Sequence, residues 1–112
     1  MVNFSIGIDI VDVERFRKIP FTSNDTFYKK NFTSLEIDYC LKFKDPYVRF
    51  AGKFALKEAT IKALKKKIAF SEIEIDHGEN DEPIVKIDSE KSFIHASLSH
   101  EKNIAVGVVF LY

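Results

Sequence analysis

Apolar and polar residues alternate with a period of two at the start of the chain. Residues 2–13 carry the apolar set Phe4, Ile6, Ile8 and Ile10. This period predicts a β-strand, in which Asp9 lies on the face opposite the isoleucines. Gly7 would let another backbone or a ligand come close to the strand. Asp9 is then either a solvent-facing or turn-forming acid, or a residue placed for chemistry.

The middle of the chain has a helical period and predicts one long helix over residues 45–67. Asp45 suits the N-cap and Pro46 the first helical position, and strong helix formers fill the body. Residues 65–67 are lysines, which oppose the negative end of the helix dipole. The apolar face of this helix consists of Tyr47, Phe50, Ala51, Phe54, Ala55 and Ile61.

The charged residues of the long helix are of two kinds. On the side away from the apolar face we expect solvated cations, namely Arg49, Lys53 and Lys57. Glu58 instead falls within the apolar face, and Lys62 lies beside it one turn further on. A carboxylate there must be paired, hydrogen-bonded or bound to a cation. One interpretation is a weak Glu58–Lys62 ion pair, and the other is a metal-binding carboxylate with a lysine beside it for phosphate.

Shorter helices are predicted before the long one. Asp12 is placed to cap the first, at residues 13–19, and residues 25–32 favour a second. A capping box, Thr-Ser-Leu-Glu, opens a third at residues 33–43. A repeat of i, i+4 predicts that this third helix buries Leu35, Tyr39 and Phe43.

Alternating patterns return after the long helix. Residues 68–76 and 84–88 predict one hairpin, and residues 93–99 and 104–112 predict a second with a turn at 100–103. The last strand is apolar almost throughout, so we expect it to be buried on both faces, centrally or at a subunit interface. The fold class is therefore α+β: an N-terminal strand, three to four helices including one long helix, and then antiparallel strands.

The amino-acid composition limits the number of domains and the classes of function. The 112 residues favour a single domain, 1–112, with 46% hydrophobic residues and 17 acids against 17 bases. This balance gives no field that points to nucleic acid or membrane, and no apolar run approaches the roughly 20 residues of a membrane span. Cys40 is the single cysteine and fits a reducing compartment, and we interpret it as a core residue rather than a nucleophile. We expect a soluble cytoplasmic protein.

Three histidines and one basic cluster remain. We expect His77 to be solvated and His95 to be structural. His100 lies where a strand meets its turn, so it is either structural or placed to contact a ligand. The first short helix carries Arg15, Arg17 and Lys18, which form either a solvated face or a docking patch for an acidic partner.

Three segments together indicate a family: residues 6–15, residues 51–59 with 62–64, and residues 97–100. They read IGIDIVDVER, AGKFALKEA with KAL, and SLSH. In this order and spacing they resemble the holo-[acyl-carrier-protein] synthase type of the 4′-phosphopantetheinyl transferase family. The resemblance covers nearly the whole chain, from Gly7 to the last strand.

The resemblance implies a Mg²⁺-dependent enzyme of fatty acid and lipid biosynthesis. It would move the phosphopantetheine arm of coenzyme A onto a serine of an acidic acyl carrier protein and release adenosine 3′,5′-bisphosphate. It also implies a homotrimer with sites between protomers. The matched residues are Asp9 and Glu58 for the metal, Glu58 and Lys62 for catalysis, Lys44, Lys53, Lys62 and His100 for coenzyme A, and Arg15, Arg17 and Lys18 for carrier docking.

Two departures from the family pattern keep other functions open. Lysines 65–67 stand where the family has a Gly-rich turn. Lys53 stands where the family usually has an arginine, so a single ammonium group replaces a guanidinium that can form two parallel hydrogen bonds. One alternative is a non-catalytic coenzyme A or nucleotide-binding module. Another is a structural trimer in which Glu58 and Lys62 form only an ion pair. Whether Glu58 or a metal-bound water takes the proton of the carrier serine also stays open.

Overall fold

The computed structural model describes residues 3–112, so Val2 of the predicted first strand lies outside the described residues. The α+β class and the order of strand, helices and antiparallel strands are confirmed. With η for a 3₁₀ helix, the elements are β1 (Ser5–Asp12), α1 (Glu14–Arg17), η1 (Phe21–Ser23), α2 (Asp25–Asn31), α3 (Ser34–Leu41), α4 (Pro46–Leu64), η2 (Phe70–Glu72), β2 (Glu74–His77), β3 (Pro83–Lys86), β4 (Ile94–His100) and β5 (Ile104–Leu111).

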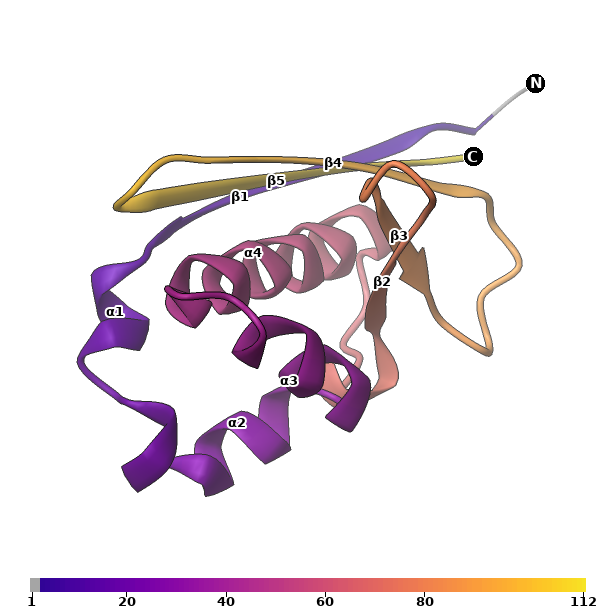
Figure 1. Ribbon diagram of the computed structural model, residues 1–112. Coiled ribbons are helices and arrows are strands. Elements are labelled where there is room, and N and C mark those ends of the chain that lie inside the picture. Colours follow the sequence, from indigo (N-terminus) through magenta and orange to yellow (C-terminus); the bar gives the residue numbers. More distant parts are fainter. Residues whose placement is uncertain (1–2) are drawn as a thin grey trace.

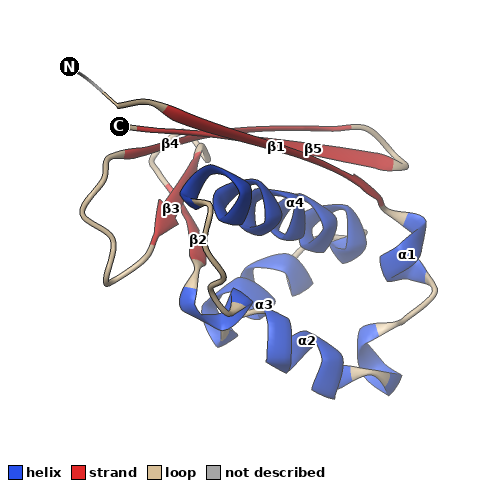
Figure 2. Cartoon of the chain, turned by 180° about the vertical axis from the view of Figure 1, so that it is seen from behind, coloured by secondary structure: helices blue, strands red, loops and turns tan. Residues whose placement is uncertain are grey.

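The architecture places α4 at the centre. An antiparallel sheet in the order β1-β5-β4 covers one side of the helix, and β2 and β3 form the predicted first hairpin separately. Figure 1 shows the sheet above α4, with α1, α2, α3 and the β2–β3 hairpin around its other sides. Figure 2 shows the same layers from behind. No helix in the described part of the chain has both the length and the apolar character to cross a membrane.

Small residues bring the sheet very close to α4. A Cβ at Gly7 of β1 would overlap the carbonyl oxygen of Ala59, and one at Gly107 of β5 would lie 2.9 Å from the Leu56 nitrogen. The Ser5 hydroxyl donates a hydrogen bond to the carbonyl of Ala63, one turn further along α4. The backbones of β1 and α4 therefore touch without side chains between them, so neither element can shift against the other.

The expectation that Lys53 and Lys57 are solvated is wrong. Their exposed fractions are 2% and 0%, because the side of α4 away from the sheet is covered by the other helices and the hairpin. Arg49 is half-buried, with its guanidinium 4.0 Å from the centre of the Phe43 ring. The predicted apolar face is only partly right, because Phe50, Ala51 and Ala55 are buried but Tyr47, Phe54 and Ile61 are half-buried. The side that meets the sheet consists instead of residues such as Leu56, Ala59 and Ala63.

Lys57 forms a fully buried ion pair with Glu36. Its Nζ lies 2.7 Å from Glu36 Oε1 and also donates to the carbonyls of Asn31 and Phe70, both at 2.9 Å. Burial lowers the pKa of Lys57, and the adjacent Glu36 carboxylate opposes that shift. All three ammonium hydrogens have acceptors, which a buried cation requires.

Glu36 connects α3 to the hairpin as well. It completes the predicted capping box by accepting from the Thr33 N–H, and its second oxygen accepts from the Ile75 N–H at 2.8 Å. The capping signal was read correctly from the sequence. The same carboxylate is also the counter-ion of Lys57 on α4, and the local sequence pattern does not indicate this pairing.

Three further expectations need correction. The long helix ends at Leu64, because Lys65 takes a left-handed conformation (φ 59°) that stops the helix. Leu35 is half exposed, since α3 turns Ile37 and Cys40 inward instead. Strand β5 is central, as expected, but only its helix-facing side is fully buried.

The outer face of the sheet is apolar and exposed. Phe4, Ile6, Ile8 and Ile10 have exposed fractions between 58% and 67%. Val106, Val108 and Phe110 of β5 pair with the last three of them and are half-buried. Contiguous apolar surface of this kind usually marks an interaction site.

We predict that Gly7→Ala destabilises the fold by about 1–3 kcal/mol or more, because the new methyl group would meet backbone that cannot move aside. Gly52→Ala is the matched control. A Cβ at Gly52 would lie 3.0 Å from a flexible Leu98 methyl group, and alanine favours the helix by about 1 kcal/mol. Urea unfolding of both variants measures the difference. Equal stability of the two would contradict the close approach.

We predict that Lys57→Met costs about 3–5 kcal/mol, because it leaves the Glu36 carboxylate buried and uncompensated. The double variant Glu36→Gln/Lys57→Met should recover part of this loss. Lys29→Met is the control, since the Lys29–Asp25 pair is exposed and should contribute less than about 1 kcal/mol. A Lys57→Met loss no greater than that of the control in urea unfolding would disprove the role of the pair.

Candidate functional site

Asp9 faces α4 from the middle of β1. It shares a face of the strand with Gly7 and Val11, which both pack against α4, so it is not the solvent-facing strand residue of one interpretation. Its side chain is 19% exposed, and its Oδ1 lies 3.1 Å from the Nζ of Lys62. The same ammonium donates to the carbonyl of Ile8 at 2.9 Å. Lys62 is thus held at the rim of the strand, with 55% of its side chain exposed.

Glu58 lies one turn before Lys62 on α4 and is half-buried. Strand β1 and helix α4 run in opposite directions, because Ser5 contacts Ala63 while Gly7 contacts Ala59. Asp9, two residues beyond Gly7, therefore faces the stretch of α4 that contains Glu58. Within residues 3–112, Lys62 pairs with Asp9 and no ion pair joins it to Glu58, so the predicted alternative of a Glu58–Lys62 pair is not what the structure has.

The residues present fit a magnesium ion. Mg²⁺ is commonly held by one or two carboxylates, with substrate phosphates and waters completing its octahedron. Two carboxylates from facing elements, Asp9 and Glu58, match that need. Among the described residues no group of three or more His, Cys, Asp or Glu side chains is arranged to hold a metal alone. A metal here would depend on the phosphates of a substrate.

A basic hollow lies at the other end of α4. It has a volume of about 430 Å³, with Lys44, Asp45 and Arg49 on one side and His100, Glu101 and Lys102 on the other, so three cations face two carboxylates. His100 pairs with Ala105 of β5, so both side chains project from the helix-facing side of the sheet. Lys44 and His100, which were predicted together from the family pattern, are brought together here.

The acidic pair and the basic hollow are distinct places on one chain. Glu58 lies about 14 Å along the axis of α4 from Arg49, the nearest residue of the hollow on this helix, and about 20 Å from Asp45. The structure therefore joins Asp9 to Lys62, with Glu58 one turn before Lys62 on α4, and brings Lys44 and His100 together elsewhere. A single protomer does not bring the two groups into contact.

Lys53 belongs to neither group. Its Nζ donates to the carbonyl of Ile75 at 2.9 Å, lies 2.8 Å from His77 Nε2, and lies 4.4 Å from the centre of the Tyr39 ring. Burial lowers the pKa of Lys53. His77, expected to be solvated, instead stacks on Tyr39 and holds this lysine. We therefore leave Lys53 out of the coenzyme A site.

The predicted basic patch divides in two. Arg15 and Lys18 are exposed, and the Arg15 guanidinium lies 5.6 Å from the centre of the Phe54 ring. Arg17 instead donates hydrogen bonds to the Asp45 carboxylate and to the Lys102 carbonyl in the turn after β4. Asp12 accepts from the Glu14 N–H, in line with its predicted capping role. Only Arg15 and Lys18 thus present free charge to a partner.

Cys40 is a core residue, as predicted. It is fully buried in the helical half of the core. Burial raises the pKa of its thiol to about 12, which keeps it protonated at neutral pH. A protonated and inaccessible thiol is a poor nucleophile.

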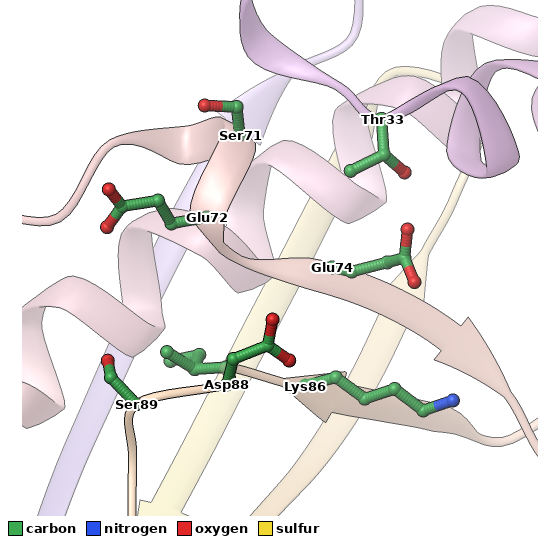
Figure 3. A pocket seen from close by; sticks show the side chains of 8 residues that line it. Thr33, Ser71, Glu72, Glu74, Lys86, Asp88 and Ser89 are labelled. Atoms are coloured by element: carbon green, nitrogen blue, oxygen red, sulfur yellow. The ribbon is translucent and has the colours of Figure 1, made fainter.

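Another hollow opens beside the β2–β3 hairpin. Figure 3 shows side chains that line it: Thr33, Ser71, Glu72, Glu74, Lys86, Asp88 and Ser89. Three carboxylates against one lysine make it unsuited to a phosphorylated substrate. None of the residues predicted for coenzyme A lies there, whereas Lys44 and His100 line the other hollow, which is therefore the better candidate.

Comparison with known proteins identifies the family. Residues 5–109 match the family model described as the 4′-phosphopantetheinyl transferase superfamily. This chain belongs to that superfamily. A holo-[acyl-carrier-protein] synthase of Thermodesulfovibrio yellowstonii is 42% identical over 108 residues, which cover 95% of this chain and 96% of the relative. One from Carboxydothermus hydrogenoformans is 38% identical and covers 97% and 98%.

Solved superfamily structures share the fold over almost the whole chain. A Bacillus anthracis holo-(acyl-carrier-protein) synthase in complex with CoA (3′,5′-ADP) has a TM-score of 0.85 at 32% identity, covering 96% of this chain and 94% of that one. The Helicobacter pylori enzyme in complex with coenzyme A has a TM-score of 0.84 at 33% identity, covering 96% and 99%.

Two residues of the basic hollow were missed from the sequence. Arg49 was assigned to a solvated side of α4, and Lys102 was treated only as part of a turn. A signal for both was available, because Arg49 follows the N-cap by one turn and Lys102 follows His100 by two residues. Their meeting depends on how β4 and β5 place their turn beside the start of α4, which no local pattern encodes.

Proposed function

We propose that this protein transfers the 4′-phosphopantetheine group of coenzyme A to a serine of an apo acyl carrier protein. The observation that carries the proposal is the placement of Asp9 and Lys62 in contact, with Glu58 on the adjacent turn of α4. Superfamily membership and the coenzyme A complexes of similar structures support it.

Asp9 and Glu58 would hold Mg²⁺, and Lys62 would contact the phosphates. When bound, the ion supplies charge neutralisation and Lewis acidity at the pyrophosphate. Lys62 stabilises charge that develops on the phosphate oxygens as the bridging bond breaks. A bond forms between the serine oxygen and the phosphorus next to pantetheine, and the bond to adenosine 3′,5′-bisphosphate breaks. The serine loses its proton, and either Glu58 or a metal-bound water accepts it.

The basic hollow would bind the nucleotide end of coenzyme A. Lys44, Arg49 and Lys102 provide positive charge, and His100 provides a ring nitrogen for hydrogen bonding. Lys65 keeps the left-handed conformation that a glycine would adopt most readily, so the loss of the Gly-rich turn changes the side chain more than the path of the backbone. This favours an active enzyme over a non-catalytic binding module.

The distance between the two groups supports a site shared by protomers. With about 14 Å of helix between Glu58 and Arg49, the nearest residue of the hollow on α4, the acidic pair of one chain would meet the basic hollow of another. The exposed apolar face of β1 and β5 is suited to bury that contact. The number of protomers, three, rests on the family resemblance.

Arg15 and Lys18 are the residues proposed to dock the acidic carrier, because both are exposed at the end of β1 that leads away from Asp9. Opposite charges accelerate such encounters, and the effect weakens with salt. The cytoplasmic location and the single domain over residues 1–112 stay predictions.

We predict that Asp9→Asn and Glu58→Gln each lower transfer by about 10²-fold or more, because either change removes a carboxylate that would hold the ion. Mass spectrometry of an apo carrier protein incubated with coenzyme A and Mg²⁺ measures the gain of the phosphopantetheine mass. Asp38→Asn, on the exposed face of α3, is the control and should transfer normally. Near wild-type transfer by either site variant at saturating Mg²⁺ would rule out the metal assignment.

We predict that Ile8→Glu disrupts the trimer and abolishes transfer, because a charge would be buried at the contact between protomers. Leu35→Glu is the matched control, since Leu35 is 50% exposed on α3, away from the sheet. Sedimentation equilibrium should give three chain masses for the wild type and the control, and fewer for Ile8→Glu. A trimer that survives Ile8→Glu with full activity would exclude this face as the interface.

A further inference from the structure

Arg17 has an unusually complete set of hydrogen bonds for a residue on a short surface helix. One terminal nitrogen donates to Glu14 Oε1 at 2.8 Å and to Asn103 Oδ1 at 3.0 Å. The other donates to Asp45 Oδ2 at 2.8 Å and to the Lys102 carbonyl at 2.6 Å. These four bonds use every hydrogen on the two terminal nitrogens. The guanidinium therefore has little left to offer a docking partner.

The acceptors of Arg17 lie on both walls of the basic hollow. Asp45, with Lys44 beside it, forms the wall at the start of α4. Lys102, two residues after His100, belongs to the wall made by the β4–β5 turn. Arg17 lies on α1, a third element, and bonds to one residue of each wall. It is thus a cross-link between segments that are otherwise far apart in the sequence.

The cross-link is partly shielded from water and fixed at both ends. The Arg17 side chain is 21% exposed, and a second link from the same region joins the Val13 N–H to the Asn103 carbonyl at 2.9 Å. Asp45 is held in turn, because its other oxygen caps α4 through the Tyr47 N–H. Burial raises the pKa of the Asp45 carboxyl, but the hydrogen bonds from Arg17 and Tyr47 outweigh it and hold the pKa below its usual value.

We propose that Arg17 is a positioning residue that sets the width of the basic hollow by holding the Lys44 wall and the His100 wall together. The inference rests on the proposed function, in which this hollow binds the nucleotide end of coenzyme A. It removes Arg17 from the carrier-docking patch and leaves Arg15 and Lys18 there. The two neighbouring arginines then serve different substrates of one reaction.

Three variants separate these roles. Arg17→Gln removes the charge and most of the cross-link. The dissociation constant and the KM for coenzyme A should therefore rise on the order of tenfold. The kcat and the KM for the carrier protein should stay within twofold of the wild-type values. Arg17→Lys keeps the charge but has a single ammonium, so the rise should be smaller. Arg15→Gln should raise the carrier KM and leave coenzyme A binding unchanged. Lys30→Gln, an exposed cation of α2, controls for loss of charge.

Titration calorimetry with coenzyme A and Mg²⁺, and initial rates against each substrate, measure these quantities. The inference would be overturned if the dissociation constant and KM of Arg17→Gln for coenzyme A stayed within twofold of wild type, or if only its KM for the carrier protein rose. Should Arg17→Gln not fold, Arg17→Lys decides: weaker coenzyme A binding supports the cross-link, and unchanged binding overturns it. A wild-type protein that does not bind coenzyme A would overturn the proposed function and this inference together, whereas normal transfer by all Arg17 variants would overturn only the inference.

Discussion

The structure depends on the direct contact between the backbones of β1 and α4. Gly7 leaves no room for a side chain between the strand and Ala59, so the register of the two elements is set by shape rather than by any single bond. Asp9 follows Gly7 by two residues and therefore shares its face of the strand. Its contact with Lys62 is a consequence of that register. The chemistry proposed for this protein is thus built on a packing constraint.

The same constraint makes α4 the centre of the molecule. The sheet lies on one side of the helix, and α1–α3 and the hairpin lie around its other sides. Ten of its 19 residues are buried, Lys53 and Lys57 among them. Its two buried lysines are accommodated by acceptors that each come from elsewhere in the chain: Glu36 for Lys57, and the Ile75 carbonyl and His77 for Lys53. These bonds attach α3 and the hairpin to α4 and leave Lys62, near the end of the helix, as the cation available for chemistry.

Much of the fold could be predicted because local patterns correspond to local structure. The alternation around Ile8, the capping box at Thr33 and the N-cap at Asp45 all appear where expected. Glu58 could be singled out because an acid on an apolar helix face needs a partner, whereas Asp9 was joined to it only through the family resemblance. The burial of Lys57 could not be predicted, since its counter-ion lies 21 residues away and is itself hidden in a capping motif. The role of Arg17 depends on four acceptors that only the tertiary fold assembles.

The central claim is that Asp9 and Glu58 share one hard cation beneath the pyrophosphate of coenzyme A. Crystals grown with coenzyme A and Mn²⁺, which prefers the same oxygen ligands as Mg²⁺ and scatters anomalously, would test it most directly. The account predicts one anomalous peak in contact with a carboxylate oxygen of each residue and with phosphate oxygens of the ligand. A peak that touches only one of these carboxylates, or a pyrophosphate bound with no peak between them, would contradict it.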